Sequence, residues 1–298
     1  MQHRDLARAG DPVTDTFSEH RPLLFSIAYR MLGSAADAED ILQDAFLRWQ
    51  ISAAGVESPR RFLATMVSRL CINHLKSARV RREQYVGQWL PEPVFTPSRD
   101  DPTESVTAGE SISMAFMVLL ERLNPLERAV FVLREVFDYD YSGIAEIVGR
   151  REAYCRQLLH RAHAHLKRER TRFDAKPEQH ATLLQRFLEA TLRGDLDGLL
   201  AVLSNDVVLF SDGGGKAPAV PLPVFGAEKA GRLMIGATKK FAPEDAVFLL
   251  APLNGKPAIV AYVDGVPRTA ILIEARTHGI QRVFIISNPE KFTTIPHL

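Results

Sequence analysis

The sequence predicts a multidomain protein in which two all-α domains are followed by a smaller α+β domain. Three observations support this prediction. Helical periodicity covers about 15–82, and it resumes near 110 and continues to about 172 after a proline-rich interruption at 90–103. Beyond a polar hinge at 174–179, three helical patterns are interspersed with five β-rich runs. With 298 residues, the chain is long enough for two or three domains of ordinary size.

Composition narrows the class of protein. Hydrophobic residues make up 46% of the chain and charged residues 24%, which is the balance of a soluble globular protein. No apolar run approaches the roughly 20 residues that a membrane span needs. Residues 1–15 lack the apolar core of a signal peptide. We therefore expect a cytoplasmic protein with no membrane partner. Cys71 and Cys155 lie inside helical patterns and are predicted to pack in cores, and no metal site, cofactor or catalytic residue is predicted.

The distribution of charge is more informative than the net charge of +1. From Arg69 to Arg82 there are five basic residues and no acidic one. From Arg150 to Arg172 there are eight basic residues and two acidic ones. Because both clusters fall on helical stretches, they predict two contacts with a polyanion.

The first domain contains a helix that begins near Ser34. The segment Ser34-Ala-Ala-Asp37 has the Ser-x-x-acid form of a helix start, with Asp37 in place of the usual glutamate. A buried stripe is predicted from the spacing of the apolar residues Ala38, Ile41, Leu42, Ala45, Phe46 and Trp49. Asp37, Asp40 and Asp44 fall on the opposite side and form an acidic, exposed ridge.

The next helix is predicted from Phe62 to about Arg82. Its expected core residues are Phe62, Leu63, Met66, Leu70 and Leu75, and its expected outer residues are Arg69, Asn73, Lys76 and Arg79. Cations suit phosphate contact and an asparagine can hydrogen-bond a base edge, so this outer face is a candidate nucleic-acid surface.

The second domain contains a helix-turn-helix pattern from Ser142 to Leu158. Ala145 is small enough for two helices to cross closely, and Gly149 gives the turn its positive φ. Cys155 and Leu158 are predicted to face the core. The outward residues could then reach base edges and phosphates in a major groove: Arg151, Glu152, Tyr154, Arg156, Gln157 and His160.

The C-terminal domain is predicted to contain helices at 181–193, 196–203 and 227–240. Strands are predicted at 207–211, 246–251, 258–263, 268–275 and 281–286. Asn254-Gly255, Asp264-Gly265 and His278-Gly279 separate the last four runs as turns. A curved antiparallel sheet with helices behind it is compatible with a small-molecule ligand.

The first domain resembles region 2 of the extracytoplasmic-function sigma factors, which belong to the sigma-70 family, over 21–30, 35–49 and 59–76. The resemblance implies that the acidic helix binds the β′ clamp helices of bacterial RNA polymerase core through Asp37, Asp40, Gln43 and Asp44. It also implies that the following helix melts and reads the minus-ten element of promoter DNA through Arg69, Asn73, Lys76, Arg79, Arg81 and Arg82. The family often has Asp where this chain has Asn73, and Arg where it has Lys76.

The segments 123–134 and 142–158 resemble sigma region 4, and they follow region 2 at the expected spacing. The resemblance implies contact with the β flap of the polymerase and with the minus-thirty-five element. The residues implied in that DNA contact are Arg150, Arg151, Glu152, Tyr154, Arg156, Gln157, His160 and Arg161. The family commonly has Ser at the position of Arg151, which adds a phosphate contact but cannot cap the helix in the same way.

The remaining segments resemble a subgroup of these sigma factors that carries a C-terminal SnoaL-like (NTF2-like) extension. The signature residues are Trp89, Leu90, Pro91, Glu92 and Pro93 in the linker, Asp212, Gly213, Gly214, Gly215 and Lys216 in a loop, and Asn288, Pro289, Glu290 and Lys291 near the end. The subgroup commonly has Asp and Leu in place of Glu290 and Phe292. The resemblance implies regulation in cis by the extension. We expect the linker to dock on the other two segments and so to set the spacing of the two DNA-reading domains.

Domain limits follow from these assignments: sigma region 2 at 14–84, a linker at 85–111, sigma region 4 at 112–173 and the SnoaL-like domain at 178–298. One alternative is a ligand-responsive helix-turn-helix transcription regulator, which would leave the acidic helix and the first basic helix unexplained. A second is an enzymatic role for the extension, with Asp212, Asp264 and His278 as polar candidates beside turn glycines. The loop 212–216 lacks the spacing of a phosphate-binding P-loop.

Overall fold

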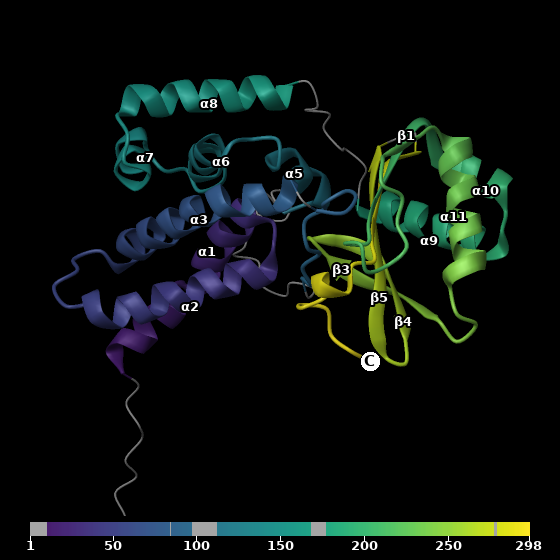
Figure 1. Ribbon diagram of the computed structural model, residues 1–298, viewed down its shortest axis with the longest axis horizontal. Helices are drawn as coiled ribbons and strands as arrows, with labels where there is room; N and C mark the ends of the chain where they lie inside the picture. Colours follow the sequence, from purple (N-terminus) through teal and green to yellow (C-terminus); the bar gives the residue numbers. More distant parts are fainter. Residues whose placement is uncertain (1–10, 84, 97–111, 168–176, 277–278) are drawn as a thin grey trace, which may run out of the picture. The chain divides into compact units, whose positions relative to one another are not determined.

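The computed structural model describes residues 11–83, 85–96, 112–167, 177–276 and 279–298, with only the backbone for 78–83, 167 and 177 (Figure 1). The chain divides into two compact units. The first holds the described residues up to Leu32 together with Ala36–Ser77 and Asn124–Ala162. The second holds Gly33–Ala35 and the described residues of 78–123 and 163–298. Within the described ranges, no helix is long and apolar enough to cross a membrane.

Three helices, α1 (Pro12–Leu32), α2 (Ala35–Ser52) and α3 (Pro59–Glu83), supply most of the first unit. The stripe predicted for α2 is confirmed, because Ala38, Ile41, Leu42, Ala45 and Trp49 are buried. Phe46 is only partly buried, and the centre of its ring lies 5.1 Å from that of Phe17 on α1 in an edge-to-face contact. The Trp49 indole N–H donates to the Val13 carbonyl at 2.9 Å, which ties the end of α2 to the start of α1.

The core face predicted for α3 is partly wrong. Leu63 and Leu75 are buried as expected, but Phe62, Met66 and Leu70 are only partly buried. The buried stripe instead runs through Leu63, Ala64, Val67, Cys71, Ile72 and Leu75. Successive residues of a helix are rotated by about 100° around its axis. The buried face lies one position later than predicted, so Phe62, Met66 and Leu70 lie at the border of the core. These three side chains line a surface groove.

The helix-turn-helix has the predicted form. Helix α6 (Pro125–Phe131) starts with a capping box between Asn124 and Glu127, and it continues directly into the π-helix η1 (Val132–Val136). Helix α7 (Tyr141–Val148) is capped by Asp140 and ends at Gly149, whose φ is 65°. Helix α8 (Glu152–Lys167) follows, with Cys155 and Leu158 buried as predicted.

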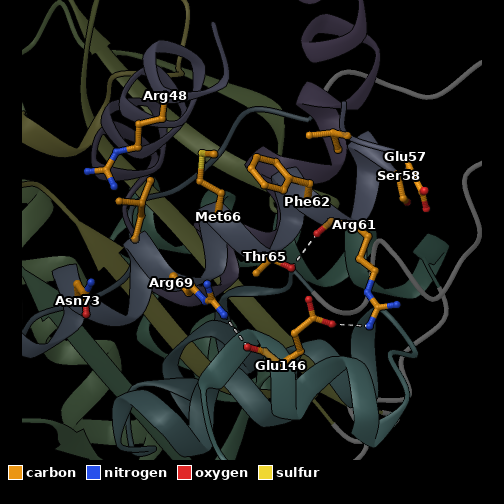
Figure 2. A pocket seen from close by; sticks show the side chains of 12 residues that line it. Arg48, Glu57, Ser58, Arg61, Phe62, Thr65, Met66, Arg69, Asn73 and Glu146 are labelled. Carbon is orange, nitrogen blue, oxygen red and sulfur yellow. Dashed lines mark hydrogen bonds and ion pairs between the residues drawn. The ribbon is translucent and has the colours of Figure 1, made fainter. Parts of the chain in front are cut away.

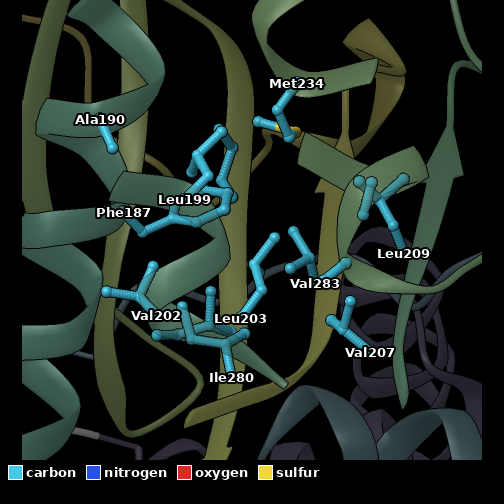
Figure 3. Packing of buried hydrophobic residues seen from close by; sticks show 14 of the residues in the cluster. Phe187, Ala190, Leu199, Val202, Leu203, Val207, Leu209, Met234, Ile280 and Val283 are labelled. Atoms are coloured by element: carbon cyan, nitrogen blue, oxygen red, sulfur yellow. The ribbon is translucent and has the colours of Figure 1, made fainter. Parts of the chain in front are cut away.

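The second unit contains a six-stranded sheet in the order β2-β1-β6-β5-β4-β3. The strands are β1 (Leu203–Asp212), β2 (Val224–Phe225), β3 (Val247–Leu253), β4 (Lys256–Val263), β5 (Val266–Arg276) and β6 (Gly279–Ile286). Helices α9 (Pro177–Arg193), α10 (Leu196–Val202) and α11 (Ala227–Phe241) cover one face (Figure 1). Phe187, Leu199 and Met234 from these helices pack on Val207, Val283 and their neighbours in an apolar cluster (Figure 3).

The predicted antiparallel sheet is correct except at β1. This strand is longer than predicted, and it pairs in parallel with β6, with Phe210 opposite Phe284. The short strand β2, which pairs with β1, was not predicted. The direction in which β1 enters the sheet depends on the packing of α10 and α11, and a strand pattern in the sequence carries no information about that packing.

The other face of the sheet is covered by segments from both ends of the unit. Leu90 of the linker, helix α5 (Met114–Leu120) and two C-terminal residues, Phe292 and Ile295, join an apolar cluster with residues of β3 to β6. Phe95 also forms an antiparallel bridge to Leu253 at the edge strand β3. Because both faces are covered, β4 has five consecutive buried residues, Ala258–Tyr262.

Candidate nucleic-acid interface

The first unit carries a surface groove of about 700 Å³ along α3 (Figure 2). The apolar side chains of Phe62, Met66 and Leu70 line it together with cationic and polar residues: Arg48, Arg61, Arg69, Ser58, Thr65 and Asn73. An aromatic ring and a thioether give an unpaired base a surface to stack on, and arginines beside them can hold its phosphates. The groove therefore has the chemistry of a single-strand nucleic-acid site.

Three of the residues predicted to contact the minus-ten element share this side of α3. Arg69 and Asn73 line the groove, and Lys76, which is also exposed, follows Asn73 by one turn. The side chains of Arg79, Arg81 and Arg82 lie outside the described residues. Arg61 was not predicted from the sequence, and Phe62 and Met66 were predicted to lie in the core. The pair Arg60-Arg61 at the start of α3 was the available signal for a cationic site.

Two arginines of the groove contact the first helix of the helix-turn-helix. Arg61 Nη2 lies 2.6 Å from the Glu146 carboxylate on α7. Arg69 donates from Nη2 to the Glu146 carbonyl at 2.7 Å and from Nε to the Ile147 carbonyl at 3.1 Å. The Arg61 and Glu146 side chains remain 54% and 57% exposed, so this ion pair is screened by solvent.

The predicted acidic ridge on α2 is partly engaged by basic side chains. Asp40 and Gln43 are exposed. Asp44 forms a two-bond ion pair with Arg48 one turn later, with both distances at 3.0 Å. Asp37 lies 3.4 Å from His74 Nε2 on α3. Among the four predicted polymerase contacts, Asp40 and Gln43 are thus the most accessible.

The predicted minus-thirty-five residues lie on or just before α8 and are exposed, except that Glu152 is half-buried. They are Arg150, Arg151, Glu152, Tyr154, Arg156, Gln157, His160 and Arg161. Arg156 forms an ion pair with Glu152 at 2.8 Å, and its guanidinium lies 4.6 Å from the centre of the Tyr141 ring. These two contacts fix the Arg156 side chain on the outer surface of the helix.

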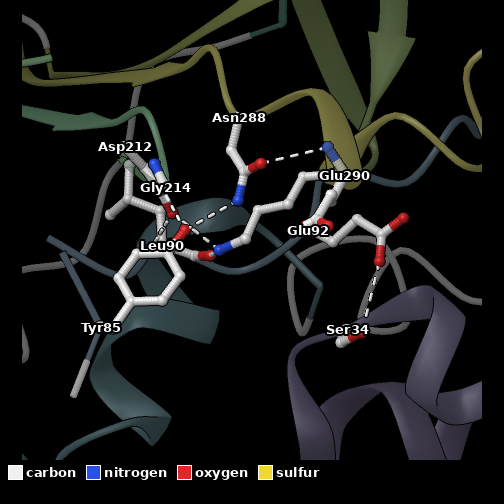
Figure 4. Close-up of polar contacts among 9 residues, drawn as sticks. Ser34, Tyr85, Leu90, Glu92, Asp212, Gly214, Asn288 and Glu290 are labelled. Carbon is white, nitrogen blue, oxygen red and sulfur yellow. Dashed lines mark hydrogen bonds and ion pairs between the residues drawn. The ribbon is translucent and has the colours of Figure 1, made fainter. Parts of the chain in front are cut away.

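In the second unit, the linker, the glycine loop and the C-terminal segment meet at the buried Asp212 (Figure 4). Its carboxylate accepts from the Tyr85 hydroxyl at 2.6 Å, from the Leu90 N–H at 2.8 Å and from the Lys291 ammonium at 2.7 Å. The Lys291 ammonium also lies 4.2 Å from the centre of the Trp89 ring. Burial, and then the adjacent Asp212, raise the pKa of the Tyr85 hydroxyl, so this residue stays a neutral donor.

The glycine loop fits closely against this junction. Gly214 has a φ of 60°, and a Cβ placed there would lie 2.4 Å from the side-chain nitrogen of Asn288. Asn288 in turn donates to the Tyr85 hydroxyl at 2.8 Å. Lys216 forms an exposed ion pair with Glu290. The structure thus brings together the three signature segments, and it adds Tyr85, which was not predicted from the sequence.

Glu92 of the linker makes a second buried junction. Its N–H donates to the Gly33 carbonyl at 2.8 Å, and its carboxylate accepts from the Ala35 N–H at 2.7 Å and from the Thr293 hydroxyl. The turn Gly33–Ala35 belongs to the same unit as the linker. A Cβ on Gly33 would lie 2.8 Å from the Trp89 ring. Glu92 therefore supplies an acceptor at the start of α2 that the Ser-x-x-acid pattern did not indicate.

The three candidates for chemistry in the extension do not form a common site among the described residues. Asp212 is fully buried and engaged by the linker and Lys291. Asp264 lies in the β4–β5 turn with a φ of 52°. His278 lies outside the described residues. The described part of the chain also holds no group of three or more His, Cys, Asp or Glu residues arranged for a metal ion.

Comparison with known proteins identifies the family. Residues 16–81 match the family model for sigma-70 region 2, and residues 113–166 match the model for sigma-70 region 4. The chain is 38% identical to the extracytoplasmic-function (ECF) RNA polymerase sigma factor SigJ of Mycobacterium tuberculosis, over 94% of this chain and 93% of that protein. The chain belongs to the ECF sigma factors. The predicted order of the two sigma regions is confirmed, and the assignment favours a sigma factor over a ligand-responsive regulator.

Two further comparisons extend the match of this sigma factor to its C-terminal domain. The chain is 33% identical to the probable ECF sigma factor SigI of Mycobacterium tuberculosis, with 94% of both chains covered. The crystal structure of SigJ from Mycobacterium tuberculosis superposes with a TM-score of 0.76 at 36% identity, covering 96% of this chain and all of that one. The predicted architecture, two helical sigma regions followed by an α+β SnoaL-like domain, is therefore confirmed.

Proposed function

We propose that this sigma factor binds bacterial RNA polymerase core in the cytoplasm and directs it to promoters through three surfaces. The observation that supports the proposal best is the groove on α3. It combines the Phe62 ring and the Met66 thioether with arginines and the exposed Asn73, in the region that matches sigma-70 region 2. An unpaired base of the minus-ten element would stack on Phe62 and Met66, and Asn73 would contact a base edge.

Region 4 supplies the upstream contact in this proposal. The exposed residues of α8, with Tyr154, Gln157 and His160 among them, would enter the major groove of the minus-thirty-five element. The cations Arg150, Arg151 and Arg161 would hold the flanking phosphates. The β flap of the polymerase would bind the same helical region, so that the two promoter elements are read at one fixed spacing.

The exposed part of α2 is the proposed contact with the β′ clamp helices. Asp40 and Gln43 are accessible. Asp37 and Asp44 would also contact the polymerase once they release their basic partners, His74 and Arg48. Removing a rim charge mainly slows association and changes its dependence on salt.

The SnoaL-like domain is proposed to act in cis and without catalysis. Asp212 and Lys291 of this domain hold the linker at one buried junction, and Thr293 contacts Glu92 of the linker at the other. Loosening either junction would free the linker and so change the distance that the two sigma regions can span. A small-molecule ligand for this domain stays a prediction.

Binding to core polymerase followed by footprinting tests the proposal. Asp40→Lys should weaken co-elution with core polymerase, and Glu19→Lys, at an exposed position on α1, serves as the matched control. On DNA from upstream of its own gene, Lys76→Ala should weaken protection of the downstream element, and Gln157→Ala should weaken protection of the upstream element. Protection that changes equally at both elements would contradict the assignment of α3 and α8.

A further inference from the structure

Glu146, near the end of α7, is one of the residues that line the groove on α3. Glu146 contacts Arg61 through its carboxylate and Arg69 through its carbonyl (Figure 2). The Ile147 carbonyl also accepts from Arg69. We propose that this end of α7 masks the minus-ten surface of the free sigma factor, by occupying with its oxygens the cations that DNA phosphates would take. The inference rests on the proposed DNA-binding role of α3, and it concerns contacts within the first unit alone.

The chemistry of the contact resembles that of a phosphate. A guanidinium donates to carboxylate and phosphate oxygens in the same planar geometry. The last carbonyls of a helix have no partner in the helix and carry the negative end of its dipole. Glu146 adds a full negative charge at that position, so one helix end presents three oxygens to two arginines.

The contact and DNA binding compete for the same atoms. Arg69 donates to carbonyls of α7 from both Nε and Nη2. This edge of the guanidinium is the one that a phosphate would contact through two parallel hydrogen bonds. The Arg61–Glu146 pair is about half exposed, so it is weak enough to be displaced. The apparent affinity for DNA is then reduced in proportion to the fraction of molecules in which the groove is open.

Fluorescence anisotropy with the full chain and a labelled single-stranded DNA of mixed sequence tests the mask. Glu146→Gln removes one side of the ion pair, so we expect an affinity about two- to fivefold higher than that of the wild type. Glu39→Gln is the matched control, because Glu39 forms an exposed ion pair with Arg21 in the same unit. It changes the net charge equally and should raise the affinity by less.

Lys76→Ala separates failure of the mask from failure of the DNA surface. Lys76 is exposed on α3, and among the described contacts none joins it to α7. If Lys76→Ala leaves the affinity unchanged, α3 is not the DNA surface, and both proposals are wrong. If it weakens binding while Glu146→Gln and Glu39→Gln have equal effects, only the mask is wrong.

A cross-link gives a second readout that does not depend on charge. Cysteines placed in the double variant Arg61→Cys and Glu146→Cys can be joined by a short bis-maleimide, and both native cysteines are buried. We expect the cross-linked protein to lose binding to the single-stranded probe relative to the same variant before cross-linking. Cross-linked protein that binds equally well, or cysteines that fail to cross-link, would overturn the proposal.

Discussion

At the scale of single residues, buried charges specify how the linker is held. Asp212 and Lys291 are almost fully buried, and each satisfies its charge with the other and with groups of the linker. A buried ion pair adds little to stability compared with apolar residues of the same size, but removing one partner leaves an uncompensated charge in the interior. The pair therefore favours one arrangement of the linker over others.

Lys291→Met should destabilise the second unit by about 3 kcal/mol, because it leaves the Asp212 carboxylate buried without its cation. Urea unfolding followed by tryptophan fluorescence in a Trp49→Phe background, where Trp89 alone emits, measures the loss. Lys216→Met is the matched control: Lys216 forms an exposed ion pair with Glu290, so we expect a loss of less than about 1 kcal/mol. Equal losses for the two variants would show that the Lys291 charge is not important for the junction.

His180 on α9 predicts how stability depends on pH. Burial, and then the positive charge of Lys256, lower the pKa of His180 from 6.5 to about 4. Between these pH values His180 therefore stays unprotonated in the folded state but binds a proton in the unfolded state. The free energy of unfolding consequently falls as the pH drops from about 6.5 towards 4. The full effect is about 3 kcal/mol. His180→Gln should flatten this dependence in urea titrations at pH 7 and pH 5, and an unchanged slope would contradict the assignment.

At the scale of elements, local patterns predicted where helices and strands lie better than which face each one buries. The α2 stripe and the turn at Gly149 could be predicted because a period of 3.6 residues and a positive φ are local properties. Phe62 and Met66 were assigned to the core because an apolar residue in a surface groove gives the same sequence signal as one in a core. The contacts of Arg61 and Arg69 with α7 join residues far apart in sequence, and no motif indicated them.

The turn of the helix-turn-helix allows a clean test of backbone strain. A Cβ on Gly149 would meet nothing within 4 Å, so only its φ of 65° opposes a side chain. Gly149→Ala should therefore cost about 1–2 kcal/mol. Gly236 in α11 also has open space but lies in regular helix, so Gly236→Ala should stabilise by about 0.5–1 kcal/mol. Chemical denaturation of both variants checks the pair, and changes of the same sign would refute the explanation.

At the scale of the whole molecule, the linker is part of the second unit and not a free tether. Leu90 and Phe95 pack in or against the apolar cluster that also contains Phe292 and Ile295. The proline-rich composition of the linker predicted a loop, and its resemblance to a signature motif predicted a docked one. Only the structure places its apolar residues on the sheet, because a run of prolines carries no period from which a buried face can be read.

Deleting residues 288–298 should release the linker, because it removes Lys291, Phe292 and Ile295 from the two junctions and the cluster. We expect faster proteolysis near residue 90 and a changed affinity for core polymerase. Deleting only the exposed residues 296–298 is the control and should have little effect on either. If affinity and transcription are both unchanged by the longer deletion, the C-terminal segment does not regulate this sigma factor in cis.

Run-off transcription tests whether this protein directs RNA polymerase core to a promoter, on a template that carries the DNA upstream of the protein's own gene. We expect a discrete transcript that requires the protein and that is reduced by Asn73→Ala or Gln157→Ala at unchanged affinity for core. Failure to form a stable complex with core, together with the absence of a transcript, would contradict this expectation.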